Sequence, residues 1–394
     1  MSFDYTNKIS KAVQQVPPSA IRKFFDLANE MKGHVISLSI GEPDFVTPWS
    51  IREAGINSLI DGYTHYSPNS GYIDSRTAIA DYLKRRYGVA YDPAHEILIT
   101  VGGSEGLDLV ARALINPGDE VVVVEPCFVA YKATVEFAHG VPVVVSTKPE
   151  NDYRLMPEEL EAAITDKTKY IIVGYPNNPT GAVMTLEDWA KIKDVLLRHP
   201  DIIVLSDELY CELNYLDGKP ASLTQFSEIR DRVIMVNGFS KSYAMTGFRV
   251  GYIAGPAELV APMIKIHQYC IMCAPTTSQY AAVEALHNGD DDVKMMRESY
   301  DERRRFVLHM LAQMGLPCFE PEGAFYVFPC IREFGMTSDE FATRLLKEEK
   351  VAIVPGTAFG DCGEGYLRIS YAYSIDNLKK ALGRLEKFVG SLRA

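Results

Sequence analysis

The sequence contains no run of roughly 18 or more apolar residues, so it predicts no membrane-spanning helix. Its N-terminal stretch is charged and mixed, without the apolar segment and cleavage site of a secretory signal. Basic residues are outnumbered, with 40 Lys and Arg against 52 Asp and Glu and a formal net charge of −12. Because a phosphate backbone needs a basic surface, this balance argues against nucleic acid as the main partner. We expect a cytoplasmic protein that acts on small molecules.

Cysteine is scarce, and the odd number of seven argues against a disulfide framework. Cys270 and Cys273 form a C-x-x-C pair, but no second pair follows at the spacing of a zinc site. The stretch around them is apolar, so we interpret both thiols as structural and predict no metal site. Internal repeats and low-complexity segments are also absent, which fits a globular enzyme with 47% apolar residues.

From about Glu96 the chain alternates short runs rich in Val and Ile with helical patterns. The runs are Ile97–Val101, Val121–Val124, Val141–Val145, Tyr170–Val173, Ile202–Leu205, Val233–Val236 and Val250–Ala254. Continuous apolar strands separated by helices are typical of a mostly parallel sheet that is buried on both faces. We therefore predict an α/β fold in which helices sandwich a mostly parallel, seven-stranded sheet.

The chain after about Ala274 follows a different, helix-rich pattern. Helices are expected over Thr277–Met314 with a break near Asn288-Gly289, near Ser338–Glu348 and near Ile375–Val389, and short strands at Ala324–Pro329, Val351–Val354 and Tyr366–Tyr371. A helix over Ser19–Lys32 and a strand over Val35–Ile40 precede them. We predict a large α/β domain over 48–285 and a smaller α+β domain formed by 1–47 together with 286–394.

Polar residues follow several predicted strands, at the ends where open α/β sheets bind their ligands. Gly102–Gly106 form a glycine turn that leads into a helix, and the free N–H groups of a helix N-terminus suit a phosphate. Asn177, Asp207 and Lys241 each follow a strand and lie about 30 residues apart, one strand–helix repeat each. We expect these side chains to converge on one site.

Pyridoxal phosphate is a cofactor that uses such groups together. Its aldehyde bonds a lysine, and an anionic aspartate keeps its ring nitrogen protonated. Arg249, eight residues beyond Lys241, is placed to neutralise the phosphate together with Ser240. Each residue alone has an ordinary explanation, such as a surface lysine, an N-capping aspartate or an Asn-Pro turn. Their order and spacing together favour the cofactor site.

Five motifs carry a resemblance to a known family. They are Gly41-Glu42-Pro43-Asp44-Phe45, Tyr175-Pro176-Asn177-Asn178-Pro179-Thr180-Gly181, Ser206-Asp207-Glu208-Leu209-Tyr210, Ser240-Lys241-Ser242-Tyr243-Ala244-Met245-Thr246-Gly247-Phe248-Arg249 and Tyr366-Leu367-Arg368-Ile369-Ser370. From about Ile36 to Tyr371 the chain resembles the fold-type I pyridoxal-phosphate enzymes of the class I/II aminotransferase family. The resemblance implies transfer of an amino group from an L-amino acid to a 2-oxo acid, with 2-oxoglutarate as the default acceptor.

The resemblance implies roles by position. Lys241 resembles the lysine that forms a Schiff base with the cofactor, and Asp207 resembles the partner of the pyridine nitrogen. Asn177 and Tyr210 match the residues at the ring hydroxyl, and Phe128 matches the aromatic residue that stacks on the ring. We expect Lys241, Asp207 and Tyr210 to be catalytic, with Lys241 moving the α-proton and a second 2-oxo acid completing a ping-pong cycle.

Phosphate contacts are implied for Gly103, Ser104, Ser240 and Arg249. Glu105 stands in the same cofactor-binding turn, at a position where the family often has glutamine. An acidic residue is unexpected this close to a phosphate, although it favours a helix N-terminus.

Two further residues carry implications for the partner and the substrate. Tyr66 matches a tyrosine that reaches the partner subunit's phosphate, which implies a homodimer with shared active sites. Arg368 matches the arginine that holds the substrate α-carboxylate, and its planar fork suits two parallel hydrogen bonds. A surface ion pair is the alternative for Arg368. Gly41, through its N–H group, and Asn177 are implied as additional substrate contacts.

The choice of substrate stays open. Ser104 stands where aspartate-preferring relatives have a lysine, which puts a strict preference for dicarboxylates in doubt. Aromatic side chains either line a pocket for large substrates or belong to the core; they are Trp49, Tyr66, Phe128 and Tyr131. The segments around Gly238–Phe248 and His267-Gln268-Tyr269 look closest to aminotransferases for aromatic amino acids, alanine and N-acetyl-diaminopimelate.

Three other functions compete with this interpretation. A β-eliminating C–S lyase on the same fold would use Lys241, Asp207 and Arg368 as well, and it would release its products without an acceptor. A non-catalytic regulatory protein is the second alternative, and the presence of all three of these side chains argues against it. A nicotinamide-dependent dehydrogenase is disfavoured because no G-x-G-x-x-G follows a predicted strand.

Overall fold

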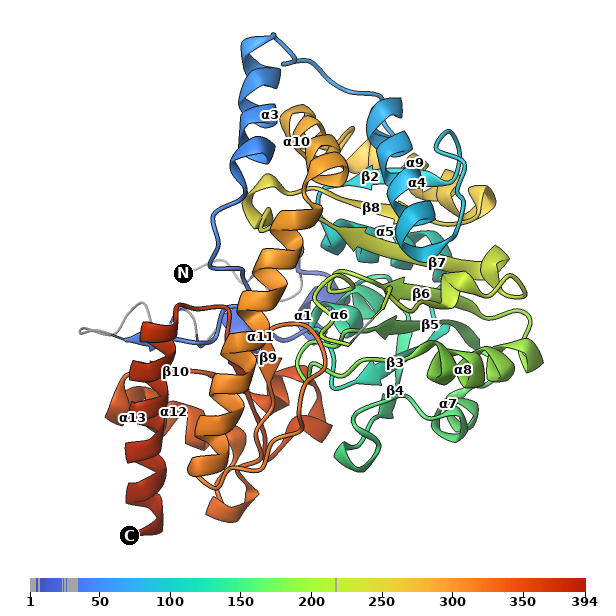
Figure 1. Cartoon of the computed structure of the whole chain (residues 1–394). Coiled ribbons are helices and arrows are strands. Elements are labelled where there is room, and N and C mark those ends of the chain that lie inside the picture. The colour runs from blue at the N-terminus through green and yellow to red at the C-terminus, as the bar shows by residue number, and fades with distance from the viewer. Residues whose placement is uncertain (1–4, 6–7, 23, 25, 27–34, 217) are drawn as a thin grey trace.

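A computed structural model describes residues 5, 8–22, 24, 26, 35–216 and 218–394. Its centre is a seven-stranded sheet in the order β2-β8-β7-β6-β5-β3-β4 (Figure 1). The strands are β2 (Ile97–Thr100), β3 (Glu120–Glu125), β4 (Val141–Ser146), β5 (Thr168–Gly174), β6 (Ile203–Asp207), β7 (Val233–Gly238) and β8 (Gly251–Ala254). β3 to β7 run parallel, whereas β8 is antiparallel to both neighbours, β2 and β7. The predicted α/β fold with a mostly parallel sheet is confirmed.

Helices cover both faces of this sheet because successive side chains of each apolar strand point to opposite faces. Val121 and Val123 of β3 share one core with α5 (Gly103–Leu114), α6 (Ala130–Phe137) and α9 (Ala257–Cys270). Val122 and Val124 pack in the opposite core with α7 (Pro157–Ala163) and α8 (Leu186–Arg198). On that same side, α4 (Ile73–Tyr87) and α10 (Thr276–Asn288) pack near β2 and β8.

The remaining elements form a smaller unit around its own core. β9 (Tyr326–Val327), β12 (Leu367–Ser370) and β11 (Val354–Pro355) make an antiparallel sheet, and α11 (Asp290–Gln313), α12 (Ser338–Glu349) and α13 (Ile375–Arg393) pack with it. β1 (Ile36–Ser37) pairs in parallel with β10 (Val351–Ala352), which joins the start of the chain to its end. This pairing supports the domain division at residues 47/48 and 285/286, which we propose.

α1 (Lys11–Gln15) and α3 (Trp49–Ile60) lie outside these layers. α1 is short, and α3 packs along α10 at the top of the molecule in Figure 1. Single 3-10 turns occupy Pro149–Asn151, Leu223–Gln225, Arg230–Arg232, Thr246–Phe248, Arg332–Phe334, Gly356–Phe359 and Asp361–Gly363. Among the described residues, no helix combines the length and the apolar character needed to cross a bilayer.

The secondary structure follows the predictions closely in the large sheet and less closely elsewhere. All seven apolar runs are strands of the one sheet, and the helix break at Asn288-Gly289 is confirmed between α10 and α11. The expected strand Val351–Val354 is divided, because β10 pairs with β1 while β11 pairs with β12. The expected helix over Ser19–Lys32 falls largely on residues outside the described ranges.

Candidate active site

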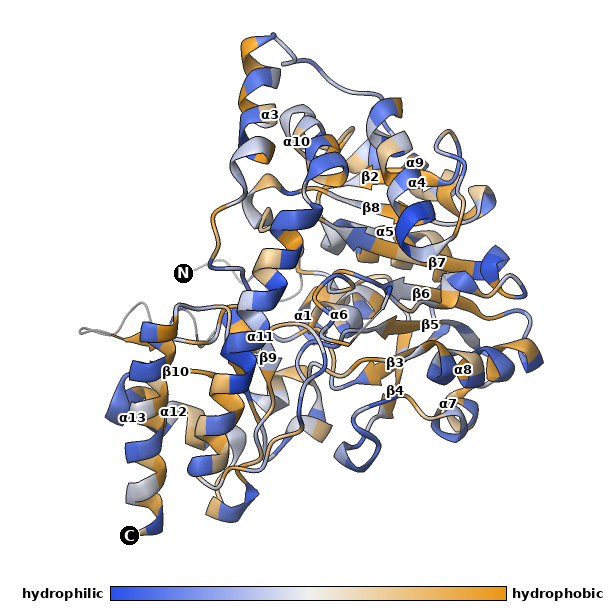
Figure 2. Cartoon of the chain, in the orientation of Figure 1, coloured by the Kyte–Doolittle hydropathy of each residue, from blue (hydrophilic) through white to orange (hydrophobic). Residues whose placement is uncertain are grey.

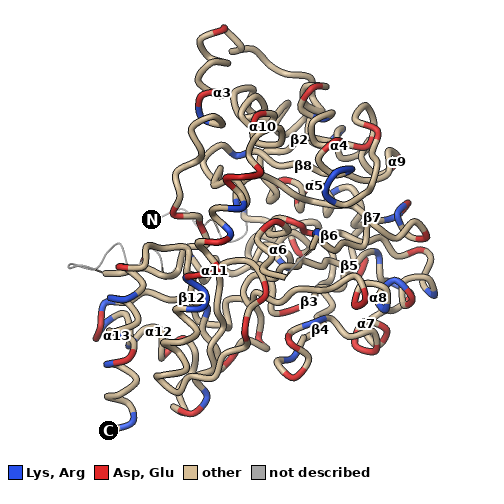
Figure 3. Tube along the Cα trace, viewed as in Figure 1, with Lys and Arg blue, Asp and Glu red and all other residues tan. Residues whose placement is uncertain are grey.

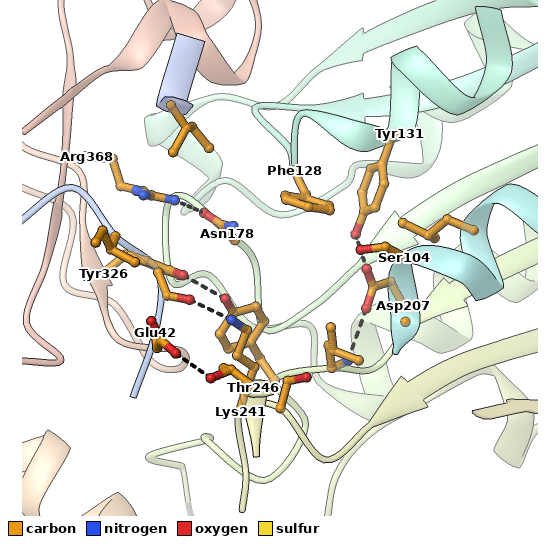
Figure 4. Close-up of a pocket in the computed structure, with 18 of the residues that line it drawn as sticks. Glu42, Ser104, Phe128, Tyr131, Asn178, Asp207, Lys241, Thr246, Tyr326 and Arg368 are labelled. Atoms are coloured by element: carbon orange, nitrogen blue, oxygen red, sulfur yellow. Dashed lines mark hydrogen bonds between the residues drawn. The ribbon is translucent and has the colours of Figure 1, made fainter. Parts of the chain in front are cut away.

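The carboxyl ends of β6 and β7 and the N-terminus of α5 meet at a pocket of about 350 Å³ (Figure 4). Ten of the residues predicted for the site line it: Gly41, Gly103, Ser104, Phe128, Asp207, Tyr210, Ser240, Lys241, Arg249 and Arg368. They come from both parts of the fold, because Gly41 and Arg368 belong to the smaller unit. The pocket therefore lies between the sheet edge and the smaller unit.

Lys241 lies in the turn after β7, with its side chain directed into the pocket (Figure 4). Its Nζ donates a hydrogen bond to the carbonyl oxygen of Gly41 at 2.5 Å. Burial lowers the pKa of Lys241 to about 8, and the nearby guanidinium groups of Arg368 and Arg249 act in the same direction. The amine is therefore much easier to deprotonate near neutral pH than an ordinary lysine, as a nucleophile or base requires.

Asp207 is the last residue of β6, and its carboxylate is fixed by two donors. The hydroxyl of Tyr131 donates to Oδ2 at 2.7 Å, and the main-chain N–H of Leu209 donates to Oδ1 at 3.1 Å. Burial raises the pKa of Asp207, while these two hydrogen bonds oppose that rise. A half-buried carboxylate held this firmly suits a fixed, positively charged N–H group in the pocket.

The Gly102–Ser104 turn offers an anion site at the start of α5. Gly102 has a φ of +77°, and a Cβ built on it would lie 2.6 Å from Nη2 of Arg249, so the turn needs glycine there. Arg249 is exposed at the pocket rim, and its Nη1 donates to the carbonyl oxygen of Thr246 at 3.0 Å. In the described ranges no Asp or Glu forms a salt bridge with Arg249. A helix N-terminus beside an unpaired guanidinium binds phosphate well.

Arg368 of β12 is buried to 1% exposure on the opposite wall. Its guanidinium lies over the rings of Tyr326 and Phe359, donates to Asn178 Oδ1 at 3.0 Å and also donates to the carbonyl oxygen of Ser39. Its Nε has no hydrogen-bond partner in the part of the chain that the structure describes, and no carboxylate there pairs with it. Because a buried charge needs a counter-charge, this geometry favours an anionic ligand over a structural ion pair.

Comparison with known proteins agrees with this geometry. The family model described as aminotransferase class I and II matches residues 33–385. The chain belongs to this family. An aspartate aminotransferase of Pyrococcus abyssi is 45% identical over 96% of this chain and 97% of its own length. Aromatic-amino-acid aminotransferase 2 of Thermococcus litoralis is 44% identical, with coverage of 96% and 97%.

Solved structures give the same result for the fold of this aminotransferase. The aspartate aminotransferase of Thermus thermophilus with maleate is 38% identical and superposes with a TM-score of 0.92, covering 96% of this chain and 99% of that one. The aromatic aminotransferase of Pyrococcus horikoshii is 42% identical with a TM-score of 0.89, covering 95% and 99%. The fold and the enzyme class are thus shared across nearly the whole chain.

Two residues that were expected to contact the cofactor or the substrate do not line the pocket. Asn177 is outside the pocket lining, because its amide is used within its own turn: Nδ2 donates to the carbonyl oxygens of Pro126 and Gly174, and Oδ1 accepts from Thr180. The neighbouring Asn178 lines the pocket instead. Glu105 is the second case, since its side chain turns away from the pocket and hydrogen-bonds elsewhere in the fold.

The four aromatic residues divide into two pairs. Phe128 and Tyr131 line the pocket and meet edge to face, with ring centroids 6.0 Å apart. Trp49 and Tyr66 do not line it, and these residues are 57% and 76% exposed. A single chain therefore builds its pocket without Trp49 and Tyr66.

Several lining residues were not predicted from the sequence. Tyr326 is the most prominent, because its hydroxyl lies 2.7 Å from that of Tyr210 and its ring lies against Arg368. A Cβ on Gly41 would lie 2.1 Å from the same hydroxyl, which explains the glycine. Ile21 comes from the N-terminal segment. The only available signal was the position of Tyr326 inside an expected strand, which does not tell a wall residue from a core residue.

The lowered pKa of Lys241 gives the first testable prediction. In the cofactor-free protein, the rate at which an amine-selective acylating reagent labels Lys241 should rise with pH around a midpoint near 8, because only the neutral amine reacts. Peptide mass spectrometry measures the labelling, with exposed Lys379 in the same digest as the control. A profile for Lys241 that coincides with that of Lys379 would contradict the environment described here.

Proposed function

We propose that this aminotransferase uses pyridoxal phosphate to move an amino group from an L-amino acid to a 2-oxo acid, with 2-oxoglutarate as acceptor and a ping-pong cycle. The observation that carries the proposal is the presence of Lys241, Asp207 and an anion-binding turn in one pocket. The residues fit the cofactor. Gly102 leaves room beside Arg249, and among the described residues Arg249 has no carboxylate partner and the half-buried Asp207 has no cation bonded to it. When bound, the cofactor supplies an electron-withdrawing ring that stabilises negative charge at the substrate α-carbon.

The chain's own residues have distinct tasks in this proposal. Lys241 Nζ holds the cofactor covalently and, once released, takes the α-proton of the amino acid and later returns it. Asp207 accepts a hydrogen bond from the protonated ring nitrogen, and Tyr131 keeps its carboxylate oriented. Ser240, Arg249 and the turn at the start of α5 bind the phosphate. Phe128 provides an aromatic face in the pocket, and Tyr210 donates toward the ring hydroxyl region.

Arg368 is the proposed site for the substrate α-carboxylate. The guanidinium is buried, lacks a carboxylate partner among the described residues and keeps Nε uncommitted. Two aromatic rings and Asn178 fix its plane, so its fork is already oriented before an anion arrives. The alternative of a surface ion pair does not fit this burial.

The pocket supports a donor with an apolar side chain. Its described cations are Lys241, Arg249 and Arg368, and each already has a role above. The remaining wall includes Ile21, Ile40, Leu107 and Phe128, and Ser104 adds only a hydroxyl. In the described part of one subunit, the pocket therefore offers no further positive charge for a second carboxylate.

A homodimer with shared sites is the proposed assembly. α3 and the following loop expose a series of large apolar side chains, and Figure 2 shows hydrophobic colour along this projecting helix. They are Trp49, Ile56, Leu59, Ile60, Tyr63 and Tyr66. Exposed apolar residues this close together favour burial against another molecule. Tyr66 is exposed and does not line the pocket of its own chain, so we assign it to the pocket of a neighbouring subunit.

Replacement of Lys241 tests the proposed function directly. Wild-type protein incubated with pyridoxal phosphate and then reduced with borohydride should carry the cofactor on the peptide that contains Lys241. Lys241→Ala should lose this label and fall by at least about a thousandfold in transamination rate, because both the covalent link and the proton carrier are gone. A fully active Lys241→Ala variant would refute the assignment.

Arg368 provides a separate test of substrate binding. Arg368→Ala should lower kcat/KM for the amino donor by about 100-fold or more, because a charge-assisted, bidentate contact is removed. Cofactor labelling at Lys241 should persist in this variant. Arg332→Ala is the matched control, since Arg332 also stacks on an aromatic ring, that of Tyr366, but lies outside the pocket. Equal losses in the two variants would count against the proposed role.

Subunit mixing tests the shared site. Tyr66→Ala and Lys241→Ala chains, each impaired alone, should regain about a quarter of wild-type activity when co-expressed, because half of the dimers then hold one intact site of two. If Tyr66 served the pocket of its own chain, no combination of these subunits would contain an intact site and mixing would restore nothing.

A further inference from the structure

A buried glutamate–histidine pair lies directly behind the Gly102–Ser104 turn. Glu105 is in the first turn of α5, and His267 is in the last turn of α9, which packs against α5. Oε1 of Glu105 lies 2.6 Å from Nδ1 of His267, and the two side chains are only 11% and 0% exposed. A carboxylate and an imidazole this deeply buried belong to the internal structure of the turn, not to its surface.

The second oxygen of Glu105 ties this pair to the turn. Oε2 accepts a hydrogen bond from the main-chain N–H of Val101 at 2.5 Å, and Val101 immediately precedes Gly102. One carboxylate thus connects the end of β2, the start of α5 and the end of α9. This bond fixes the residue that immediately precedes Gly102, whose φ is positive at +77°.

The imidazole of His267 has one polar partner in the part of the chain that the structure describes. Since a carboxylate only accepts hydrogen bonds, Nδ1 of His267 must donate. Nε2 is buried and has no partner among the residues that the structure describes. Within the described ranges, the side chain of His267 therefore bonds to Glu105 alone, although burial of an unsatisfied ring nitrogen costs free energy.

Electrostatics explains why Glu105 needs such a partner. A carboxylate in the first turn of α5 shares that helix end with the phosphate proposed above, and two anions close together in a poorly solvated place repel each other. The hydrogen bond from His267 offsets the charge and holds the carboxylate on the side away from the pocket, where Glu105 is not a lining residue.

We propose that Glu105 and His267 are positioning residues for the cofactor phosphate, an inference that rests on the proposed function. His267 keeps the Glu105 carboxylate bonded to the Val101 N–H group, and this bond keeps the turn at the start of α5 open to a phosphate. Loss of His267 releases an unbalanced carboxylate next to the phosphate site. The pair therefore acts on the phosphate of the cofactor and not on its ring.

The test compares two ligands on the cofactor-free full-length protein: pyridoxal phosphate, and pyridoxal, which lacks the phosphate. His267→Ala should weaken pyridoxal phosphate binding by about tenfold or more and change pyridoxal binding by less than about twofold. His267→Asn, whose amide N–H takes the place of Nδ1, should restore most of the affinity. His199→Ala, which removes a comparable imidazole contact to Glu161 (2.8 Å) at a remote place, is the matched control.

A double variant separates the proposed role from a general structural one. Gln at position 105 can still accept from the Val101 N–H group but carries no charge, so Glu105→Gln in the His267→Ala background should recover phosphate-dependent affinity. The phosphorus NMR shift of the bound cofactor should differ from wild type in His267→Ala and return toward it in the double variant. Equal weakening of both ligands, or no recovery in the double variant, overturns the inference. Wild-type protein that binds neither ligand would instead overturn the proposed function.

Discussion

The adjacency of parallel strands β6 and β7 places the two central side chains of the pocket. Asp207 ends β6 opposite Val236 of β7, and Lys241 follows five residues further along the chain. Because both strands point the same way and are covered by helices on both faces, their carboxyl ends are where polar side chains reach an open space. The amine and the carboxylate share a pocket as a result of strand order. The rest of the site is arranged around this pair.

Burial then sets the chemistry of those groups. The same desolvation lowers the pKa of Lys241 and raises that of Asp207, because each charged form is less stable away from water. The hydrogen bonds from the Tyr131 hydroxyl and the Leu209 N–H group partly offset the rise in the pKa of Asp207. Figure 3 shows that Lys and Arg are dispersed over the chain and do not form one basic surface. The positive charge of the pocket therefore comes from the few cationic side chains that line it. Arg249 and Arg368 supply that charge at opposite walls.

The sequence predicted the sheet and most of the pocket for identifiable physical reasons. Continuous Val and Ile runs that alternate with helical patterns are typical of strands buried on both faces, and the carboxyl ends of parallel strands lie at one edge of the sheet. Asn178 lines the pocket where Asn177 was expected, because the sequence does not tell which of two adjacent asparagines bonds within its own turn. The role of Glu105 depends on His267, a partner 162 positions away, which strand and helix patterns do not reveal. Tyr326 and Ile21 reach the pocket from distant parts of the chain, where no local pattern marks them.

A crystal structure of the protein with pyridoxal phosphate bound tests the central claim most directly. The account predicts continuous electron density from Lys241 Nζ to the cofactor, with the ring nitrogen at hydrogen-bond distance from Asp207 and the phosphate at the Gly102–Ser104 turn beside Arg249. Density for the cofactor in any other orientation, or a ring nitrogen that faces away from Asp207, would contradict it.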